Sequence, residues 1–136
     1  MLQRVADDER TISALREITR SHLGETVRHR QDVEHCLNLL QADTSALKTG
    51  AATVGEFFKD ALASFASDRE IKDLLTGYAG EHFEIACYTA IQATAESAGH
   101  LEIANICERI LEDERRTAER IYEVIPAAVG AYLAKA

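Results

Sequence analysis

The chain has few of the residues that end helices and none of the long apolar runs that cross membranes. It contains one proline, seven glycines and no tryptophan in 136 residues. This scarcity, with abundant Ala, Leu, Glu and Arg, indicates long helices and few turns. No apolar run reaches the roughly 20 residues of a membrane span, and the N-terminus lacks a signal-peptide pattern. We therefore expect one all-α domain over residues 1–136, located in the cytoplasm.

Cysteine pairs and basic clusters are also missing. Cys36, Cys87 and Cys107 are odd in number and have no CxxC spacing, which argues against a disulfide framework and a thiolate zinc site. The 23 acidic residues outnumber the 15 basic ones and give a net charge of -8, which disfavours a nucleic-acid partner. The sequence contains neither a Gly-rich phosphate loop nor a GxSxG elbow, which argues against nucleotide hydrolysis and acyl transfer.

The spacing of apolar residues predicts three long helices. A left-handed glycine, Gly99, is expected to end the second of them, and Pro126 is expected to interrupt the third because proline removes a backbone donor. Helices of this length bury their apolar stripes most simply side by side, in an antiparallel bundle. In chain order the predicted helical segments cover residues 1–8, 11–42, 54–66, 68–98, 100–125 and 127–134.

The apolar stripe of the first long helix contains polar residues where hydrocarbon is expected. After Ile18 the same face continues through His22, Glu25 and His29, because residues three and four apart are neighbours on a helix. An ionised carboxylate buried there needs a compensating partner. These three residues are therefore candidate metal ligands. The alternative is that the histidines flank a boundary and Glu25 extends outward into water.

The other two long helices carry the same anomaly. Glu81 and Glu84, three residues apart, can together bridge cations, or they can form a solvated edge. Glu114 interrupts an apolar row, unless the face is misassigned by one residue in the charged run 112–116. Tyr88, one turn beyond Glu84, is either an oxidisable neighbour or hydrogen-bond partner of the site, or a half-buried core tyrosine. Three helices with inward acids indicate one shared partner, as in a metal site.

Carboxylates from several helices, supplemented by histidines, are how helix bundles hold pairs of iron or manganese ions. Iron or manganese is favoured over zinc, which takes fewer ligands in tetrahedral geometry. The alternative hypothesis is a metal-free, dimeric bundle with a structural or interaction role. In that case Arg28, Arg30, Arg116 and water would satisfy the inward acids. No catalytic residue is assigned, and enzymatic activity is left open. The candidate ligands are His22, Glu25, His29, Glu81, Glu84 and Glu114.

Three segments resemble the YciE/YciF-like family of ferritin-like bacterial proteins. The most specific is EHFEIACY at residues 81–88, similar to that family's EHYEIAxY, and it is supported by HLGET at 22–26 and LEDE at 111–114. The resemblance covers about residues 5–125 and implies a ferritin-like bundle, often dimeric, associated with stress responses. It also implies a di-metal site whose ligands map to Glu25, Glu81, Glu84 and Glu114, with His22 or His29 alongside.

The chain departs from that family's pattern at its beginning. The family normally starts with a full helix carrying a further carboxylate, whereas only the stub at residues 1–8 corresponds here, so we expect a truncated first helix and one ligand fewer. Apolar stripes left without that helix would be exposed, which a soluble monomer rarely tolerates. The sequence therefore predicts a homodimer or other homo-oligomer, with no nucleic-acid or membrane partner.

Overall fold

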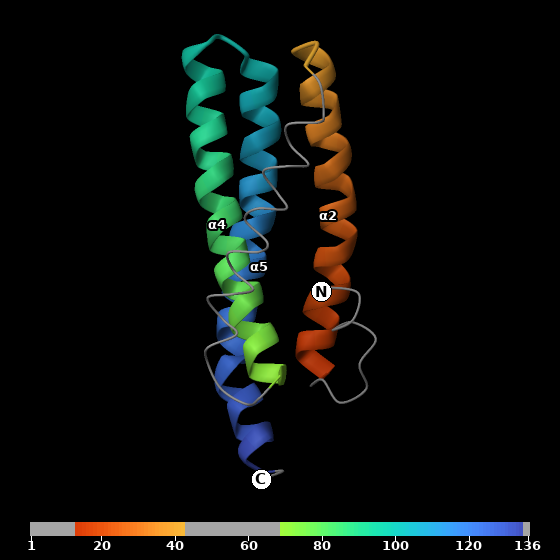
Figure 1. Cartoon of the computed structure of the whole chain (residues 1–136), viewed down its shortest axis with the longest axis vertical. Coiled ribbons are helices and arrows are strands. Elements are labelled where there is room, and N and C mark those ends of the chain that lie inside the picture. Colours follow the sequence, from red (N-terminus) through yellow and green to blue (C-terminus); the bar gives the residue numbers. More distant parts are fainter. Residues whose placement is uncertain (1–12, 43–68, 135–136) are drawn as a thin grey trace.

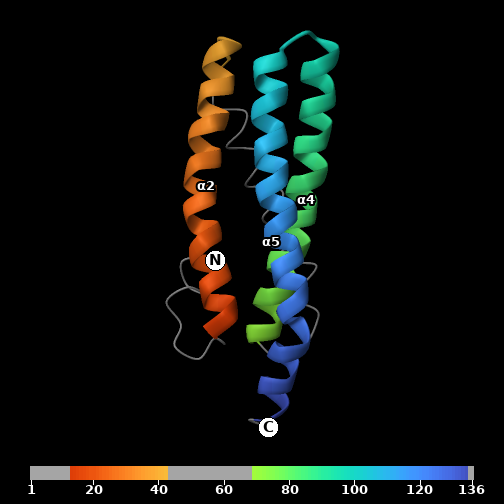
Figure 2. The same ribbon diagram turned by 180° about the vertical axis from the view of Figure 1, so that it is seen from behind.

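The protein is an all-α bundle of long helices. The computed structural model describes residues 13–42 and 69–134, and in these residues it contains three helices and no strand. Helix α5 lies antiparallel to both other helices, and α2 and α4 run in the same direction (Figures 1 and 2). The predicted fold class is confirmed, whereas the predicted helices at 1–8 and 54–66 fall outside the described residues. The helices are α2 (Ser13–Leu39), α4 (Arg69–Ser97) and α5 (Leu101–Leu133).

A tight turn joins α4 to α5. Gly99 has a φ of 78°, a left-handed conformation that glycine adopts at little cost. The His100 N–H donates to the Ala95 carbonyl at 2.8 Å, and the Gly99 N–H donates to the Glu96 carbonyl at 3.1 Å. This pair of bonds satisfies carbonyls at the end of α4 and is typical of a glycine-terminated helix. The predicted cap is confirmed, and it sets α4 and α5 side by side (Figure 1).

The predicted break at Pro126 is wrong, because α5 continues through it to Leu133. A proline inside a helix removes one backbone bond and crowds the carbonyl four residues earlier, at a typical cost of about 3 kcal/mol. That carbonyl belongs to Tyr122, which is 61% exposed, so water can reach the residue. Ile125 and Ala128, on either side of the proline, pack in an apolar cluster with the other helices, and this packing offsets the lost bond.

The core of the described residues contains two apolar clusters, and a polar layer lies between them along α2 and α5. The first cluster joins all three helices through Leu15, Ile18, Leu74, Ile121 and Ala128. The second contains Ala95, Ile103, Ala104 and Cys107, with Cys36 and Tyr88 packed against it. Burying ionisable groups in such a layer is costly unless they find partners. The buried polar residues are Thr19, His22, Glu25, His29, Glu81, Glu114 and Thr117.

Each of the three helices carries one cysteine. All three cysteines are free thiols, in accord with the absence of a disulfide framework. Cys107 is buried, and Cys36 and Cys87 are partly buried. Among the helices of the described residues, none combines the length and the apolar character that crossing a membrane requires.

Candidate metal centre

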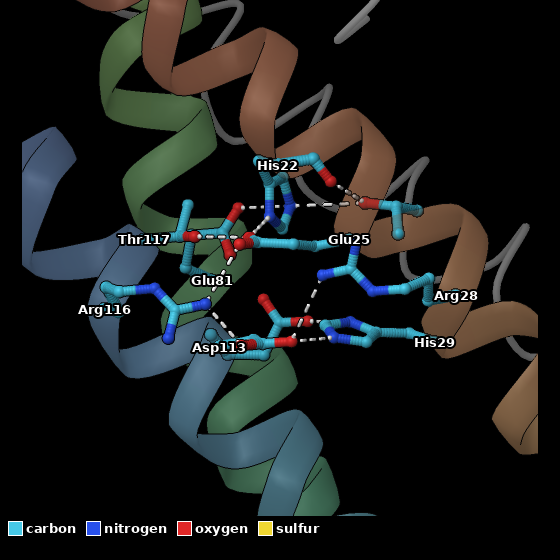
Figure 3. Close-up of polar contacts among 10 residues, drawn as sticks. His22, Glu25, Arg28, His29, Glu81, Asp113, Arg116 and Thr117 are labelled. Carbon is cyan, nitrogen blue, oxygen red and sulfur yellow. Dashed lines mark hydrogen bonds and ion pairs between the residues drawn. The ribbon is translucent and has the colours of Figure 1, made fainter.

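One residue from each helix meets at the centre of the polar layer: His22 of α2, Glu81 of α4 and Glu114 of α5. Each is buried, and one nitrogen or oxygen from each lies within 4.8 Å of the corresponding atoms of the other two. His22 Nε2 is 3.1 Å from Glu81 Oε1, a contact visible in Figure 3. We call these three residues the central trio.

Helix periodicity explains why the central trio is buried. His22 follows the buried Ile18 by four residues, and Glu114 follows the buried Ile110 by four, so each occupies the next position on an apolar stripe. Glu81 is seven residues, about two turns, after the buried Leu74. The spacing that buries hydrocarbon elsewhere in the bundle therefore also buries the imidazole and both carboxylates.

The central trio carries unpartnered polar atoms. Within the described residues, four buried side-chain atoms lack a hydrogen-bond partner: His22 Nδ1, Glu81 Oε2 and both carboxylate oxygens of Glu114. Buried polar atoms are nearly always paired, and each unsatisfied one costs about 1–3 kcal/mol. All four atoms belong to the trio, and imidazole nitrogen with carboxylate oxygen is a donor set that suits iron, manganese or zinc. The trio could therefore hold a metal ion.

Without a metal, the imidazole of His22 partly compensates the acids. Burial alone lowers the pKa of His22, but the hydrogen bond and charge of Glu81, with the charges of Glu114 and Glu84, outweigh burial and raise the pKa to about 9. The metal-free imidazole is thus protonated at neutral pH. A metal ion requires the neutral imidazole, so binding at this residue must release a proton.

Two acids of the site, Glu114 and Glu84, resist ionisation. Burial raises the pKa of Glu114, and Glu81 raises it further, while His29 opposes both. Glu84 is exposed as a residue, yet loss of solvation around its carboxyl and the charge of Glu114 raise its pKa to about 7. The structure thus places Glu84 at the rim of the site and not in its buried interior.

Glu25 is buried beside the trio but is already paired. Its Oε1 accepts a hydrogen bond from Arg116 Nη2 at 2.9 Å, and its Oε2 accepts one from Thr117 Oγ1 at 3.3 Å. His22 Nδ1 lies 3.7 Å from the same Oε2. Arg116 also donates to Asp113. Figure 3 shows this guanidinium directed at both carboxylates, so Glu25 has a charged protein partner where the sequence predicts a metal ligand.

His29 is held between two acids of α5. Its Nε2 lies 2.9 Å from Asp113 Oδ2, and its Nδ1 lies 2.9 Å from Glu114 Oε1. The second contact is an ion pair and is not aligned as a hydrogen bond, so the Glu114 oxygens have no hydrogen-bond partner. Burial lowers the pKa of His29, but Glu114 and Asp113 outweigh it and raise the pKa. The geometry gives His29 a positioning role toward Glu114.

Asp113 and Thr117 are site residues that the sequence did not single out. Burial raises the pKa of Asp113, but its hydrogen bonds to His29 and Arg116 lower it overall. The sequence contained one signal for the contact between Asp113 and Arg116. They are three residues apart, and residues at that spacing meet on a helix surface. Of the arginines expected to satisfy the inward acids, Arg116 pairs with Glu25, Arg28 lies 3.9 Å from Asp113, and Arg30 pairs with Glu34.

Tyr88 belongs to the apolar core. It is partly buried and packs against the cluster that contains Ala95 and Cys107, as the core interpretation of this residue predicted. Burial and the charges of Glu84 and Glu114 raise its pKa. The tyrosine therefore stays protonated at neutral pH, at the border between the polar layer and the second apolar cluster.

The comparisons with known proteins identify one family. The model of a family described as a domain of unknown function, DUF892, matches residues 1–134. No solved structure matches the chain. The match spans the three described helices and therefore includes every residue of the central trio.

Proposed function

The chain belongs to the DUF892 family, a family of the ferritin-like type, and from that premise we propose that it binds a divalent transition metal, iron or manganese. The observation that carries the proposal is the buried trio of His22, Glu81 and Glu114, which converges from three helices and contains buried polar atoms without hydrogen bonds. A bound cation would give those atoms the partners that the protein does not supply, and it would offset the cost of burying two carboxylates.

Each side chain has a definite task in this proposal. His22 would supply nitrogen, and Glu81 and Glu114 would supply oxygen and neutralising charge. His29 would orient Glu114 through the 2.9 Å contact at its Nδ1, as partners of metal ligands commonly do. The apolar clusters on either side limit the access of water. A bound iron or manganese ion would add redox chemistry toward oxygen or peroxide.

The proposal also covers the subfamily of the chain and its biological role. The segments EHFEIACY, HLGET and LEDE support placing the chain with the YciE/YciF-like ferritin-like proteins, and with them we propose a stress-related role. The competing function is a metal-free structural or interaction bundle. It is favoured by the Glu25 to Arg116 ion pair, because that pair satisfies a buried acid without any metal. Metal-binding measurements separate the two functions.

Thermal unfolding with and without Mn(II) tests the proposed function. An ion that binds only the folded state, at 100 times its dissociation constant, stabilises it by about 2.7 kcal/mol. For a chain of this size, that raises the melting temperature by roughly 10 °C. Glu81→Gln should lose most of this rise because it removes a ligand charge, whereas Glu112→Gln, an exposed acid of α5, should retain it. Equal rises in all three proteins would contradict the proposal.

We also propose that the chain self-associates as a homodimer. Among the described residues, large apolar side chains remain exposed, including Leu101 and Leu133 at 65% and Tyr122 at 61%. A second copy of the same chain packed along α5 would cover these side chains. Sedimentation equilibrium at micromolar concentration is expected to give twice the chain mass of 15.0 kDa. A single species at the chain mass would refute the dimer.

A further inference from the structure

We propose that Arg116 occupies the place of a second cation, so that each chain binds one metal ion at the central trio and not two. The inference rests on the proposed function, because it concerns how many ions the same polar layer accepts. It departs from the di-metal centre that the sequence resemblance implies, and the reason lies in how the remaining acids are already partnered.

Outside the central trio, Glu25 is the buried acid among the ligands that the resemblance implies, whereas Glu84 is exposed, and Asp113 shares the partner of Glu25. Glu25 and Asp113 both face the Arg116 guanidinium, which lies 2.9 Å from Glu25 Oε1 and also donates to Asp113. The other oxygen of Glu25 accepts from Thr117. A guanidinium is always charged and presents several donors in one plane, which lets it hold two carboxylates together. These acids therefore have a permanent cation of the protein between them.

Both ring nitrogens of the nearby His29 already face carboxylates. One nitrogen lies 2.9 Å from an oxygen of Asp113, and the other lies 2.9 Å from an oxygen of Glu114. His22, by contrast, has an Nδ1 without a hydrogen-bond partner. Within the described residues, unpartnered buried side-chain atoms occur only in His22, Glu81 and Glu114. The buried atoms without a hydrogen bond therefore belong to the central trio alone, and the neighbouring Glu25 and Asp113 already face a cation of the protein.

The charges of the polar layer also favour one ion per chain. One divalent ion balances the two carboxylates of the central trio. A second divalent ion near Glu25 and Asp113 would lie beside the guanidinium, and like charges repel one another. Arg116 is half exposed, with 51% of its side chain accessible, so replacing it alters the charge of the layer without opening a large cavity.

The test counts bound Mn(II) by equilibrium dialysis with elemental analysis and by electron paramagnetic resonance. Wild type is expected to hold one ion per chain, with the spectrum of an isolated Mn(II). Arg116→Gln should free Glu25 and Asp113 and raise the count to two, with a spin-coupled signal. Arg115→Gln, which removes an exposed neighbouring arginine, should remain at one. Circular dichroism verifies that each variant is folded.

The outcomes separate this inference from the proposed function. If wild type holds two coupled ions, or if folded Arg116→Gln still holds one, the role of Arg116 is overturned while metal binding stands. If wild type retains no ion, metal binding itself fails. If Arg116→Gln does not fold, the wild-type spectrum decides, because an isolated Mn(II) supports the inference and a coupled pair overturns it.

Discussion

Replacing Glu114 with glutamine is expected to stabilise the metal-free protein and to abolish its stabilisation by metal. Glu114 is 0% exposed, and neither carboxylate oxygen has a hydrogen-bond partner. Burial raises its pKa, which means that the folded protein disfavours the charged form. A neutral amide of the same shape removes the cost of burying a charge, and we expect a gain of about 1–3 kcal/mol in the free energy of unfolding.

Urea unfolding in EDTA measures this gain, and the same titration in Mn(II) measures the loss of metal stabilisation. Glu108→Gln is the matched control, because it removes an exposed acid from the same helix. A fall in the stability of metal-free Glu114→Gln would contradict the account, since it would mean that His22 and His29 already satisfy the carboxylate. The expected trade of stability for ligand chemistry is common at functional sites.

The metal-free protein is expected to become less stable as pH rises from about 6 to about 9. The pKa of His22 is raised from 6.5 to about 9 on folding, so its stabilisation is complete below its unfolded value and is lost as pH rises through the folded value. The pKa of Glu84 is raised to about 7, and the folded state then binds the extra proton, so its contribution also falls with rising pH. The His22 shift corresponds to roughly 3 kcal/mol at most.

Saturating Mn(II) is expected to flatten or reverse this slope, because the bound form needs a neutral His22 and ionised acids. Urea midpoints at several pH values, with EDTA or with Mn(II), give both slopes. His22→Gln should reduce the slope in EDTA. His100→Gln, which removes an exposed histidine without a side-chain cap bond, controls for the loss of an imidazole. Identical slopes with and without metal would count against a metal site at His22.

The sequence predicted the all-α fold and the inward position of His22, Glu81 and Glu114, because both follow from periodicity within single helices. Glu114 could be recognised because it interrupts an apolar row, and Gly99 because a helix end favours a left-handed glycine. The burial of Glu114 and the helix end at Gly99 both depend on residues only a few positions away in the sequence. Pro126 was misread because its effect depends on tertiary packing around Ile125 and Ala128, which local spacing does not reveal.

The partners of Glu25 were harder to predict. The contact from Arg116 joins residues 91 positions apart, and the contact from Thr117 joins residues 92 apart. Such contacts depend on the rotation and register of α2 against α5. Spacing shows that Glu25 faces inward, but it does not show whether a metal or an arginine meets it. That distinction decides the expected number of ions, and it emerged only from the packed bundle.

The central claim is that His22, Glu81 and Glu114 form a metal site, and metal content tests it most directly. Wild type and a Glu81→Ala, Glu114→Ala double variant are loaded with Fe(II) under anaerobic conditions, desalted and subjected to elemental analysis. The account predicts about one iron per wild-type chain and essentially none in the folded double variant. Wild type that retains no iron, or a double variant that retains as much as wild type, would contradict it.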